Sequence, residues 1–483
     1  MSVQVAGNGG TTGRRGRTAA LVVVLAVFMT NLDLWIVNVA LPAMASSFST
    51  AHGPASLSSL SWVLNGYALT LAAFLVVMGR LGDRIGQRPV FLWGVTLFTV
   101  ASVVCALAPT LPVLVAARVV QAVGAAAQLP TSLALLLAAV PADRRTGATR
   151  SWAAVGGLAA AAGPVVGGLL VQVDWRWVFL VNLPIGILTV VTGLVVLPRP
   201  GAREAGRLPD LVGALLVTVA VAALSGALVQ APVWGWTSAR TLALLAVALV
   251  AGGWFVRRSA RHASPLLELS LLRLPRFGLA AAGTALFGVA FALMLLSNVL
   301  WCQEVWHWTA LRTGIALVPG PALVPVVTVL TARVVRRVGH GPLVLAGGVL
   351  FAAGLVYRVL FVSVVPDYLR DLLPSMVLSG AGVGLALGTL MAAGVQSLPG
   401  NRAATGSALV NSVRQVASTV GVAVLVTILG GSVGAGALTD FRVAWTVGAV
   451  LSLATAAVGF LLARAPADAP AAVPAGVPEP AAG

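Results

Sequence analysis

The chain has 483 residues, of which 59% are hydrophobic and only 9% are charged, whereas an ordinary soluble domain has about 25% charged residues. One crossing of the hydrocarbon core takes about 20 apolar residues, so this composition excludes a soluble enzyme, a disordered protein and a globular domain on one anchor. The net charge of +17 comes from arginine without lysine. We attribute it to cytoplasmic loops of a membrane protein rather than to nucleic-acid binding.

Hydropathy predicts an all-α integral membrane protein with fourteen spans. In chain order they cover 19–44, 58–79, 89–108, 112–140, 147–171, 176–197, 209–229, 239–257, 277–300, 311–332, 342–363, 371–396, 404–430 and 441–463. The predicted parts are a tail 1–18, a six-helix bundle 19–200, two inserted helices with a basic loop 201–275, a second six-helix bundle 276–464, and a disordered tail 465–483.

Arginine alternates between the loops. With a cytoplasmic N-terminus, 22 of the 30 arginines fall on the cytoplasmic side, 5 on the outside and 3 within spans. Cytoplasmic loops of membrane proteins are enriched in basic residues. The distribution therefore supports the helix count and predicts that both termini are cytoplasmic, in the plasma membrane of a bacterium.

One pair of loops indicates an internal repeat. GRLGDRIGQRPV follows the second span and ARVVRRVGHGPL follows the tenth, and their alignment pairs Gly86 with Gly339 and Asp83 with Arg336. The tenth span is then the second of the last six, so the seventh and eighth form an insert. Two such halves are typical of transporters whose substrate site lies at the midplane between them.

Asp33 is the one acid deep in any predicted span. A charge at the centre of a membrane helix costs about 2.5–3.5 kcal/mol on insertion scales, so such residues indicate function. Desolvation favours the neutral form of a buried carboxyl group, which suits a reversible proton carrier. The alternative is a structural acid paired permanently with an arginine. Asn38 lies about 140° around the helix from Asp33, so we expect the two not to face one cavity.

Two other spans carry polar stripes. Arg118, Gln121 and Gln128 share one face of the fourth span by their spacing. The stripe of the thirteenth span consists of Ser407, Asn411, Arg414 and Ser418. A polar stripe must face protein or water, because lipid would leave it unsatisfied. We interpret the stripe of the thirteenth span as lining of a substrate cavity, with an interhelical hydrogen-bond seam as the alternative.

Several polar and aromatic residues near span ends are further candidates for the cavity. The full set of lining candidates is Asn38, Trp62, Asn65, Gln121, Gln128, Asn298, Gln303, Asn411 and Arg414. By contrast, we expect Trp301, Trp306 and Trp308 to form an interfacial aromatic belt. We expect Arg358, near an outer end, to extend its charge toward water.

Five motifs in order resemble the major facilitator superfamily, and within it the fourteen-helix drug:proton antiporter subfamily. They are LDLWIVNVALP (32–42), GRLGDRIGQR (79–88), RVVQAVGAAAQ (118–128), GPVVGG (163–168) and WRWVFLVNLPIG (175–186). The resemblance runs from about residue 19 to residue 464. Ala122 and Ala159 stand where the family motifs usually have glycine.

The resemblance implies roles for three groups of residues. Arg118 is linked to proton transfer in the family; its charge could instead hold Asp33 ionised. The loop after the second span is implied to latch the two halves together, through Gly79, Asp83, Arg84, Gly86 and Arg88. The fifth span is implied to contain the hinge that seals the cavity of antiporters, at Gly163, Pro164, Gly167 and Gly168. Gly163 and Gly167 also form a GxxxG pattern, which allows close helix packing.

The resulting prediction is a secondary transporter that exports small lipophilic compounds in exchange for protons by alternating access. Its expected partners are the substrate, protons and lipid, without nucleic acid, and we expect a monomer. The histidines and the two cysteines show no metal-ligand spacing, and no Walker loop is present, so we expect neither a cofactor nor an enzyme. The alternatives are an exporter dedicated to one product of the same cell and a non-transporting membrane sensor.

Overall fold

The computed structural model describes residues 9–49, 55–140, 145–197, 210–262, 268–398, 403–430 and 436–465, and their regular structure is helical throughout. The first half contains α1 (Gly9–Ser47), α2 (Leu57–Ile85), α3 (Gln87–Ala106), α4 (Leu111–Ala139), α5 (Arg145–Val171), α6 (Trp177–Leu180) and α7 (Asn182–Val196). The inserted pair is α8 (Leu211–Trp234) and α9 (Ala239–Arg261). The second half contains η2 (Leu269–Arg273), α10 (Pro275–Leu300), η3 (Trp301–Val305), α11 (Ala310–Ala316), α12 (Pro319–Val338), α13 (His340–Phe361), η4 (Tyr368–Leu372), α14 (Leu373–Gln396), α15 (Ala403–Ile428) and α16 (Ala437–Arg464).

The described helices include 13 that are long and apolar enough to cross a membrane. The one remaining predicted span, the fifth, corresponds to α5, which has 27 residues and whose part Val155–Val171 is a shorter apolar helix. Residues 1–8, the linker 198–209 and residues 466–483 lie outside the described residues, and α1 begins at Gly9, within the tail that the sequence predicted for 1–18. The all-helical membrane fold is therefore confirmed.

Two predicted spans are broken rather than continuous. The span predicted at 176–197 is divided into α6 and α7, and the span predicted at 311–332 into α11 and α12. Proline explains both breaks, because its ring displaces the carbonyl four residues earlier. Pro184 acts on Leu180, where α6 ends, and Pro321 acts on Leu317, one residue after α11 ends.

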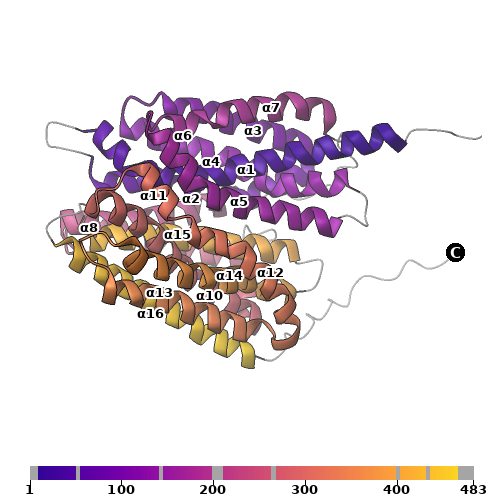
Figure 1. The fold of residues 1–483 in the computed structure, drawn as a ribbon. Helices are drawn as coiled ribbons and strands as arrows, with labels where there is room; N and C mark the ends of the chain where they lie inside the picture. The colour runs from indigo at the N-terminus through magenta and orange to yellow at the C-terminus, as the bar shows by residue number, and fades with distance from the viewer. Residues whose placement is uncertain are drawn as a thin grey trace, which may run out of the picture.

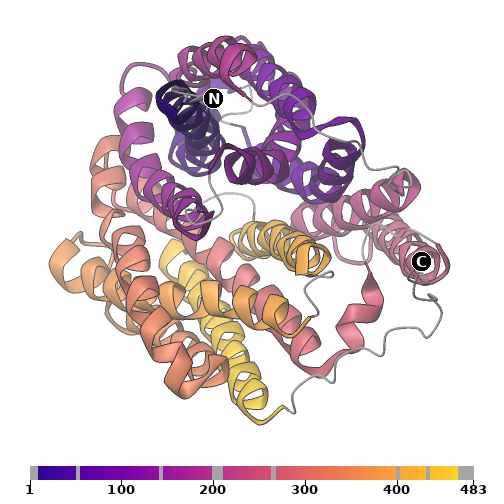
Figure 2. The same cartoon turned by 90° about the vertical axis from the view of Figure 1, so that its right-hand side faces the viewer.

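The helices form two halves with their long axes roughly parallel (Figure 1). Helices α1–α7 make the upper layer in this view and α10–α16 the lower one. Helix α1 begins and α16 ends at the same end of the molecule, which we call the termini end; the opposite end is the far end. Seen from the termini end, α8 and α9 lie to one side and α15 lies near the centre, between the halves (Figure 2).

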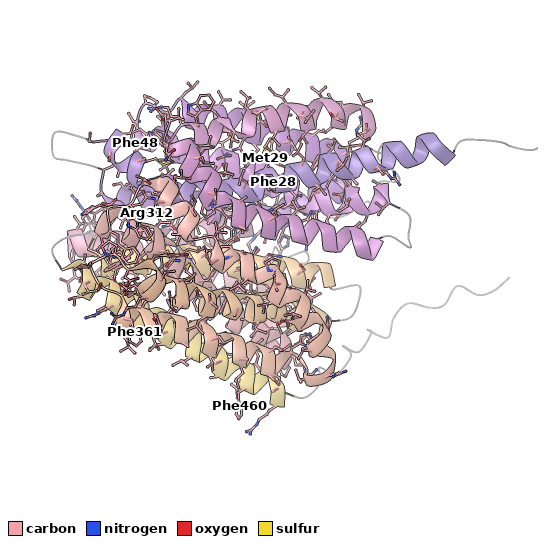
Figure 3. All side chains as sticks on the ribbon, in the orientation of Figure 1. Phe28, Met29, Phe48, Arg312, Phe361 and Phe460 are labelled. Carbon is pink, nitrogen blue, oxygen red and sulfur yellow. The ribbon has the colours of Figure 1, made fainter. Side chains whose placement is uncertain are left out.

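Large apolar side chains cover the outer surface. Leu249 is 77% exposed, and Phe361 and Phe460, labelled in Figure 3, are 45% and 43% exposed. Such exposure suits a bilayer, since lipid tails are as apolar as these side chains. The surface therefore agrees with a membrane location along the length of the helices.

The two loops that suggested a repeat have the same backbone turn. Gly86 ends α2 with φ +107° and Gly339 ends α12 with φ +80°. Each glycine N–H donates to the carbonyl four residues earlier, at 2.9 and 2.8 Å, and the next helix starts at the following residue. Both φ values lie in the left-handed region that L-residues rarely adopt. Glycine is therefore required at this turn in each half.

Substituting this glycine tests the turn. We expect Gly86→Ala to destabilise the protein by roughly 1–3 kcal/mol, because alanine would hold a backbone conformation that is nearly exclusive to glycine. Thermal unfolding in detergent measures the effect. Gly157→Ala on α5 is the control, since a methyl group there meets nothing within 4 Å. If both variants unfold like the unsubstituted protein, the turn imposes no strain.

Asp210 links the two inserted helices, α8 and α9, at the termini end. This buried residue precedes α8, and its carboxylate accepts the N–H of Gly213 at 2.9 Å and the Nε of Arg258 on α9 at 2.8 Å. Burial alone would raise the pKa of Asp210. The N–H of Gly213 and the guanidinium of Arg258 outweigh burial, so the pKa of the carboxyl group is lowered below its usual 3.8.

This lowered pKa predicts a dependence of stability on pH. A carboxylate whose pKa is lower in the folded state stabilises the fold above its unfolded pKa, about 3.9, and loses that contribution as pH falls through the folded pKa. We expect Asp210→Asn to lower the unfolding temperature at pH 7, with the difference shrinking below about pH 4. Asp174→Asn is the control, because the Asp174–Arg176 pair is 42% and 37% exposed. A difference that stays constant with pH would contradict the assignment.

Candidate functional site

A buried ion pair joins α1 to α4. The carboxylate Oδ2 of Asp33 accepts a hydrogen bond from Nη1 of Arg118 at 2.5 Å, and the two side chains are 0% and 1% exposed. Two opposite charges in contact can be kept inside a bundle, whereas either one alone would be strongly destabilising. The pairing with arginine that the sequence left open is therefore present in this structure, and a proton-carrying role for Asp33 remains a prediction.

Amide side chains complete the hydrogen bonding of this carboxylate. Its Oδ1 accepts from Nε2 of Gln121 at 3.0 Å and from Nδ2 of Asn182 at 3.1 Å. The same two nitrogens donate to Oγ of Ser102, at 2.8 and 3.3 Å. Ser102, Gln121 and Asn182 are all fully buried. Helices α1, α3, α4 and α7 thus each contribute one or more groups to a network around Asp33.

The guanidinium of Arg118 contacts several other groups besides the Asp33 carboxylate. Besides Asp33 it donates through Nη1 to Oε1 of Gln121 at 2.6 Å and through Nε to the carbonyl of Val63 at 3.3 Å. Its central carbon lies 4.1 Å from the centre of the Tyr67 ring, a cation–π contact with α2. The network therefore links five of the helices in the first half.

The sequence identified part of this network. The shared face of α4 correctly brings Arg118 and Gln121 together, while Gln128 lies farther along and accepts from Thr30 at 3.0 Å. Ser102 and Asn182 were missed as site residues. Asn182 could have been found from its place in the motif WRWVFLVNLPIG. Ser102 gave no signal, because a serine in an apolar helix is common.

The predicted hinge glycines pack α5 against two partners. A methyl group on Gly167 would lie 3.0 Å from the side chain and the carbonyl of Ile36, and one on Gly163 would collide with Trp35, both on α1. One on Gly168 would lie 2.6 Å from the carbonyl oxygen of Ala310, in the other half. The GxxxG pair therefore binds α5 to α1, and the next glycine brings α5 against α11.

The contact between α5 and α11 is reciprocal. A methyl group on Gly314 of α11 would collide with the carbonyl of Pro164. Near the same end, Nε2 of Gln303 donates to the carbonyl of Val39 across the halves at 3.1 Å. Arg312, labelled in Figure 3, lies on α11 at the far end of the molecule. The two halves therefore meet backbone to backbone at the far end.

The loop predicted to latch the halves makes contacts within the first half. Gly79 faces Pro130 of α4, and Nη2 of Arg88 donates to the carbonyl of Leu194 on α7 at 2.5 Å. Asp83 accepts from Nε2 of Gln87 at 2.7 Å. Arg84 is exposed. A latch that switches during transport remains a prediction.

The remaining lining candidates lie in different places. Asn38 is half-buried and donates to the carbonyl of Leu34 on its own helix at 2.9 Å. Trp62 packs against Gly226 of the inserted α8, 3.5 Å from the site of a methyl group there. Asn65 is fully buried, and its amide has no hydrogen-bond partner among the described residues. These three residues do not come together around one cavity.

Asn298 serves the second half as a partner for a buried arginine. Its Oδ1 accepts from Nη1 of Arg358, whose Nε donates to Oγ of Ser375 at 2.8 Å. Asn298 and Arg358 are 2% and 1% exposed. The prediction that Arg358 extends to water is therefore wrong, because polar groups on α10 and α14 hold it inside. Asn298 faces this arginine rather than open space.

The three tryptophans expected in an interfacial belt are buried instead. Trp301, Trp306 and Trp308 are 1%, 4% and 7% exposed. Trp301 packs edge-on against Trp445 of α16, with ring centres 5.2 Å apart, and Trp306 lies 4.7 Å from Trp308. The π-turn η3 at the end of α10 folds these side chains inward, so the belt prediction is wrong.

No group of three or more His, Cys, Asp or Glu residues that could hold a metal ion occurs in the described part of the chain. Cys105 and Cys302 are buried free thiols. The chemistry available at the site is therefore that of the Asp33–Arg118 pair and of hydrogen-bonding side chains.

Comparison with known proteins agrees with this architecture. Residues 23–422 match the Major Facilitator Superfamily. Multidrug resistance protein Stp of Mycobacterium tuberculosis is 37% identical over 407 residues, covering 84% of this chain and 74% of that protein. Methylenomycin A resistance protein of Streptomyces coelicolor is 34% identical over 445 residues, covering 90% and 88%.

Solved structures show the same fold at low identity. The inward open xylose transporter XylE from E. coli is 13% identical with a TM-score of 0.64, covering 92% of this chain and 96% of that chain. The POT family transporter PepTSo is also 13% identical, with a TM-score of 0.62 and coverage of 92% and 97%. The chain, a multi-pass protein of the plasma membrane, belongs to the Major Facilitator Superfamily of transporters and is not an enzyme.

Proposed function

We propose that this protein exports small lipophilic compounds from the cell and takes up protons in exchange. The observation that carries the proposal is the Asp33–Arg118 pair, a buried titratable group inside the bundle. The names of the two relatives, a multidrug resistance protein and an antibiotic resistance protein, support efflux. The alternation of arginine supports a cytoplasmic termini end, so that the closed far end faces outward.

The pair offers a physical route for coupling. Protonation of Asp33 would remove the charge that Arg118 faces at 2.5 Å, and the arginine would then need another acceptor. Gln121 and Asn182 both donate to Oδ1, and this oxygen would still accept from them if the proton bound at Oδ2. Proton binding would therefore mainly loosen the contact between α1 and α4. Alternating access would use this rearrangement to open and close the seam between the halves.

The proposal has two forms, a multidrug exporter and an exporter of one product, which differ in the range of compounds they transport. A multidrug exporter would respond to many lipophilic compounds, whereas an exporter dedicated to one product would respond to one. The relatives include names of both kinds, a multidrug resistance protein and a methylenomycin A resistance protein. A panel of compounds therefore belongs in the first experiment.

The experiment is proton flux in proteoliposomes that enclose a pH-sensitive dye. We expect a compound from the panel to trigger proton movement in the unsubstituted protein and Asp33→Asn to abolish it, because an amide cannot carry the proton. Asp174→Asn is the control, since this acid is 42% exposed in a loop. Full proton-coupled transport by Asp33→Asn would exclude Asp33 as the carrier. No proton movement with any compound would contradict antiport.

A further inference from the structure

The polar stripe of α15 faces the seam between the halves. On the opposite side of this helix, Leu409, Val413, Val416 and Val420 line an apolar cavity whose other walls come from α2, α8, α9, η2 and α10. At 100° per residue, the stripe residues Ser407, Asn411, Arg414 and Ser418 lie about 180° around the helix from these residues. Since α15 lies near the centre between the halves in Figure 2, with α8 and α9 to one side, we place the stripe on the seam. All four of its residues are half-buried.

Arg414 brings an unbalanced positive charge to this stripe. Its Nη2 donates to Oδ1 of Asn411 at 3.2 Å, while its buried Nε has no hydrogen-bond partner among the described residues. None of the ion pairs within the described part of the chain includes Arg414. It lies about 16 Å along α15 from the termini end, near the middle of the span. A guanidinium at this depth is costly unless an anion compensates it.

None of the acids among the described residues supplies that anion. Asp33 is bound to Arg118 and is 0% exposed. Glu304 and Asp371 belong to the π-turns at the far-end limits of their spans. The other described acids lie in loops or at the ends of helices; they are Asp83, Asp174, Asp210, Glu268, Asp367 and Asp440. With Arg358 also held by neutral groups only, the described interior carries more positive than negative charge.

An aromatic pair lies on the same stretch of α10 that contacts the backbone of Arg414. The Arg414 carbonyl is 3.6 Å from the site of a methyl group on Gly288 of α10. One turn further along, Phe291 packs edge-on against Trp35 of α1, with ring centres 5.9 Å apart. Both rings are half-buried and come from opposite halves. A flat apolar body could therefore pack against this aromatic pair while an acidic group reaches the guanidinium.

From these observations we infer that the substrate site takes ring-bearing lipophilic anions, with a carboxylate or an ionised phenol bound to Arg414. The inference rests on the proposed function, in which the seam between the halves is the transport site. It excludes lipophilic cations as the preferred substrates, because the described seam offers them no free carboxylate. A charge-assisted hydrogen bond to guanidinium is about twice as strong as a neutral one.

Binding of three matched probes tests this inference. They are naphthalene-2-carboxylate, its methyl ester and 2-naphthyltrimethylammonium, measured by equilibrium dialysis against purified protein in an uncharged detergent. We expect the carboxylate to bind about tenfold or more tightly than the ester, and the cation to bind most weakly. Arg414→Gln is expected to remove the preference for the carboxylate, and Arg414→Lys to keep most of it. Arg464→Gln, at the exposed end of α16, is the control.

Three outcomes would overturn the inference. They are tighter binding of the cation, no binding of the carboxylate to the folded unsubstituted protein, and an unchanged carboxylate preference in a folded Arg414→Gln variant. The assay uses no gradient, so it is separate from the proposed antiport. Proton-coupled export of cations would keep the proposed function and exclude this substrate class. Binding of the carboxylate without any proton flux would support this substrate class and contradict the proposed antiport.

Discussion

Arg118→Gln is expected to destabilise the protein by about 3–5 kcal/mol, because it leaves the Asp33 carboxylate buried without a countercharge. Asp33→Asn is expected to have a similar cost, since it leaves the guanidinium unpaired. Chemical unfolding in detergent measures both changes. The double variant is expected to recover much of the loss, because two neutral amides can hydrogen-bond to Gln121, Asn182 and each other. The cycle of four proteins gives the coupling energy of the pair.

The double variant also separates the two interpretations of Asp33. If the acid only balances the arginine, a double variant of restored stability should transport with normal proton coupling. If Asp33 carries the proton, the double variant should fold and bind substrate but show no compound-triggered proton flux. The control is Asp174→Asn, which breaks a pair whose side chains are 42% and 37% exposed and should cost much less. Additive effects of the two single substitutions would show that the pair does not act as a unit.

Gly314→Val is expected to prevent closure of the far end. Its side chain would meet the carbonyl of Pro164 and the backbone of Val165, which cannot turn aside as a flexible side chain could. Overpacking of this kind costs about 1–3 kcal/mol. Because 1.4 kcal/mol changes an equilibrium tenfold, the population should shift about 5- to 140-fold toward a state open at the far end.

Distances between spin labels in the two halves measure this shift. One label at Asp174 and one at Glu304 report on the far end, and both positions are exposed. The distance between them should increase in Gly314→Val. Gly157→Val on α5 is the control, because a side chain there meets nothing within 4 Å. An unchanged distance in a folded Gly314→Val protein would show that this glycine contact does not hold the far end closed.

Some of the site could be predicted from the sequence because its signal is local. The cost of an acid in lipid singles out Asp33, and helical spacing places Arg118 and Gln121 on one face. The GxxxG pattern predicts the close packing of α5 with a neighbour. The repeat of Gly86 at Gly339 predicts the same turn in both halves. Each of these depends on residues within one helix or one loop.

The amino-acid sequence alone was enough to predict the apolar spans, the turn repeated at Gly86 and Gly339, and the polar faces of the fourth and thirteenth spans. Which faces meet became clear from the folded structure: Asp33 with Arg118 and Asn182, Asn298 with Arg358, and three tryptophans folded inward. This is because lipid is as apolar as leucine, so hydropathy draws helices into the membrane without selecting their neighbours. Partners are selected by close backbone packing and by satisfaction of buried polar groups, and both depend on residues far apart in the chain.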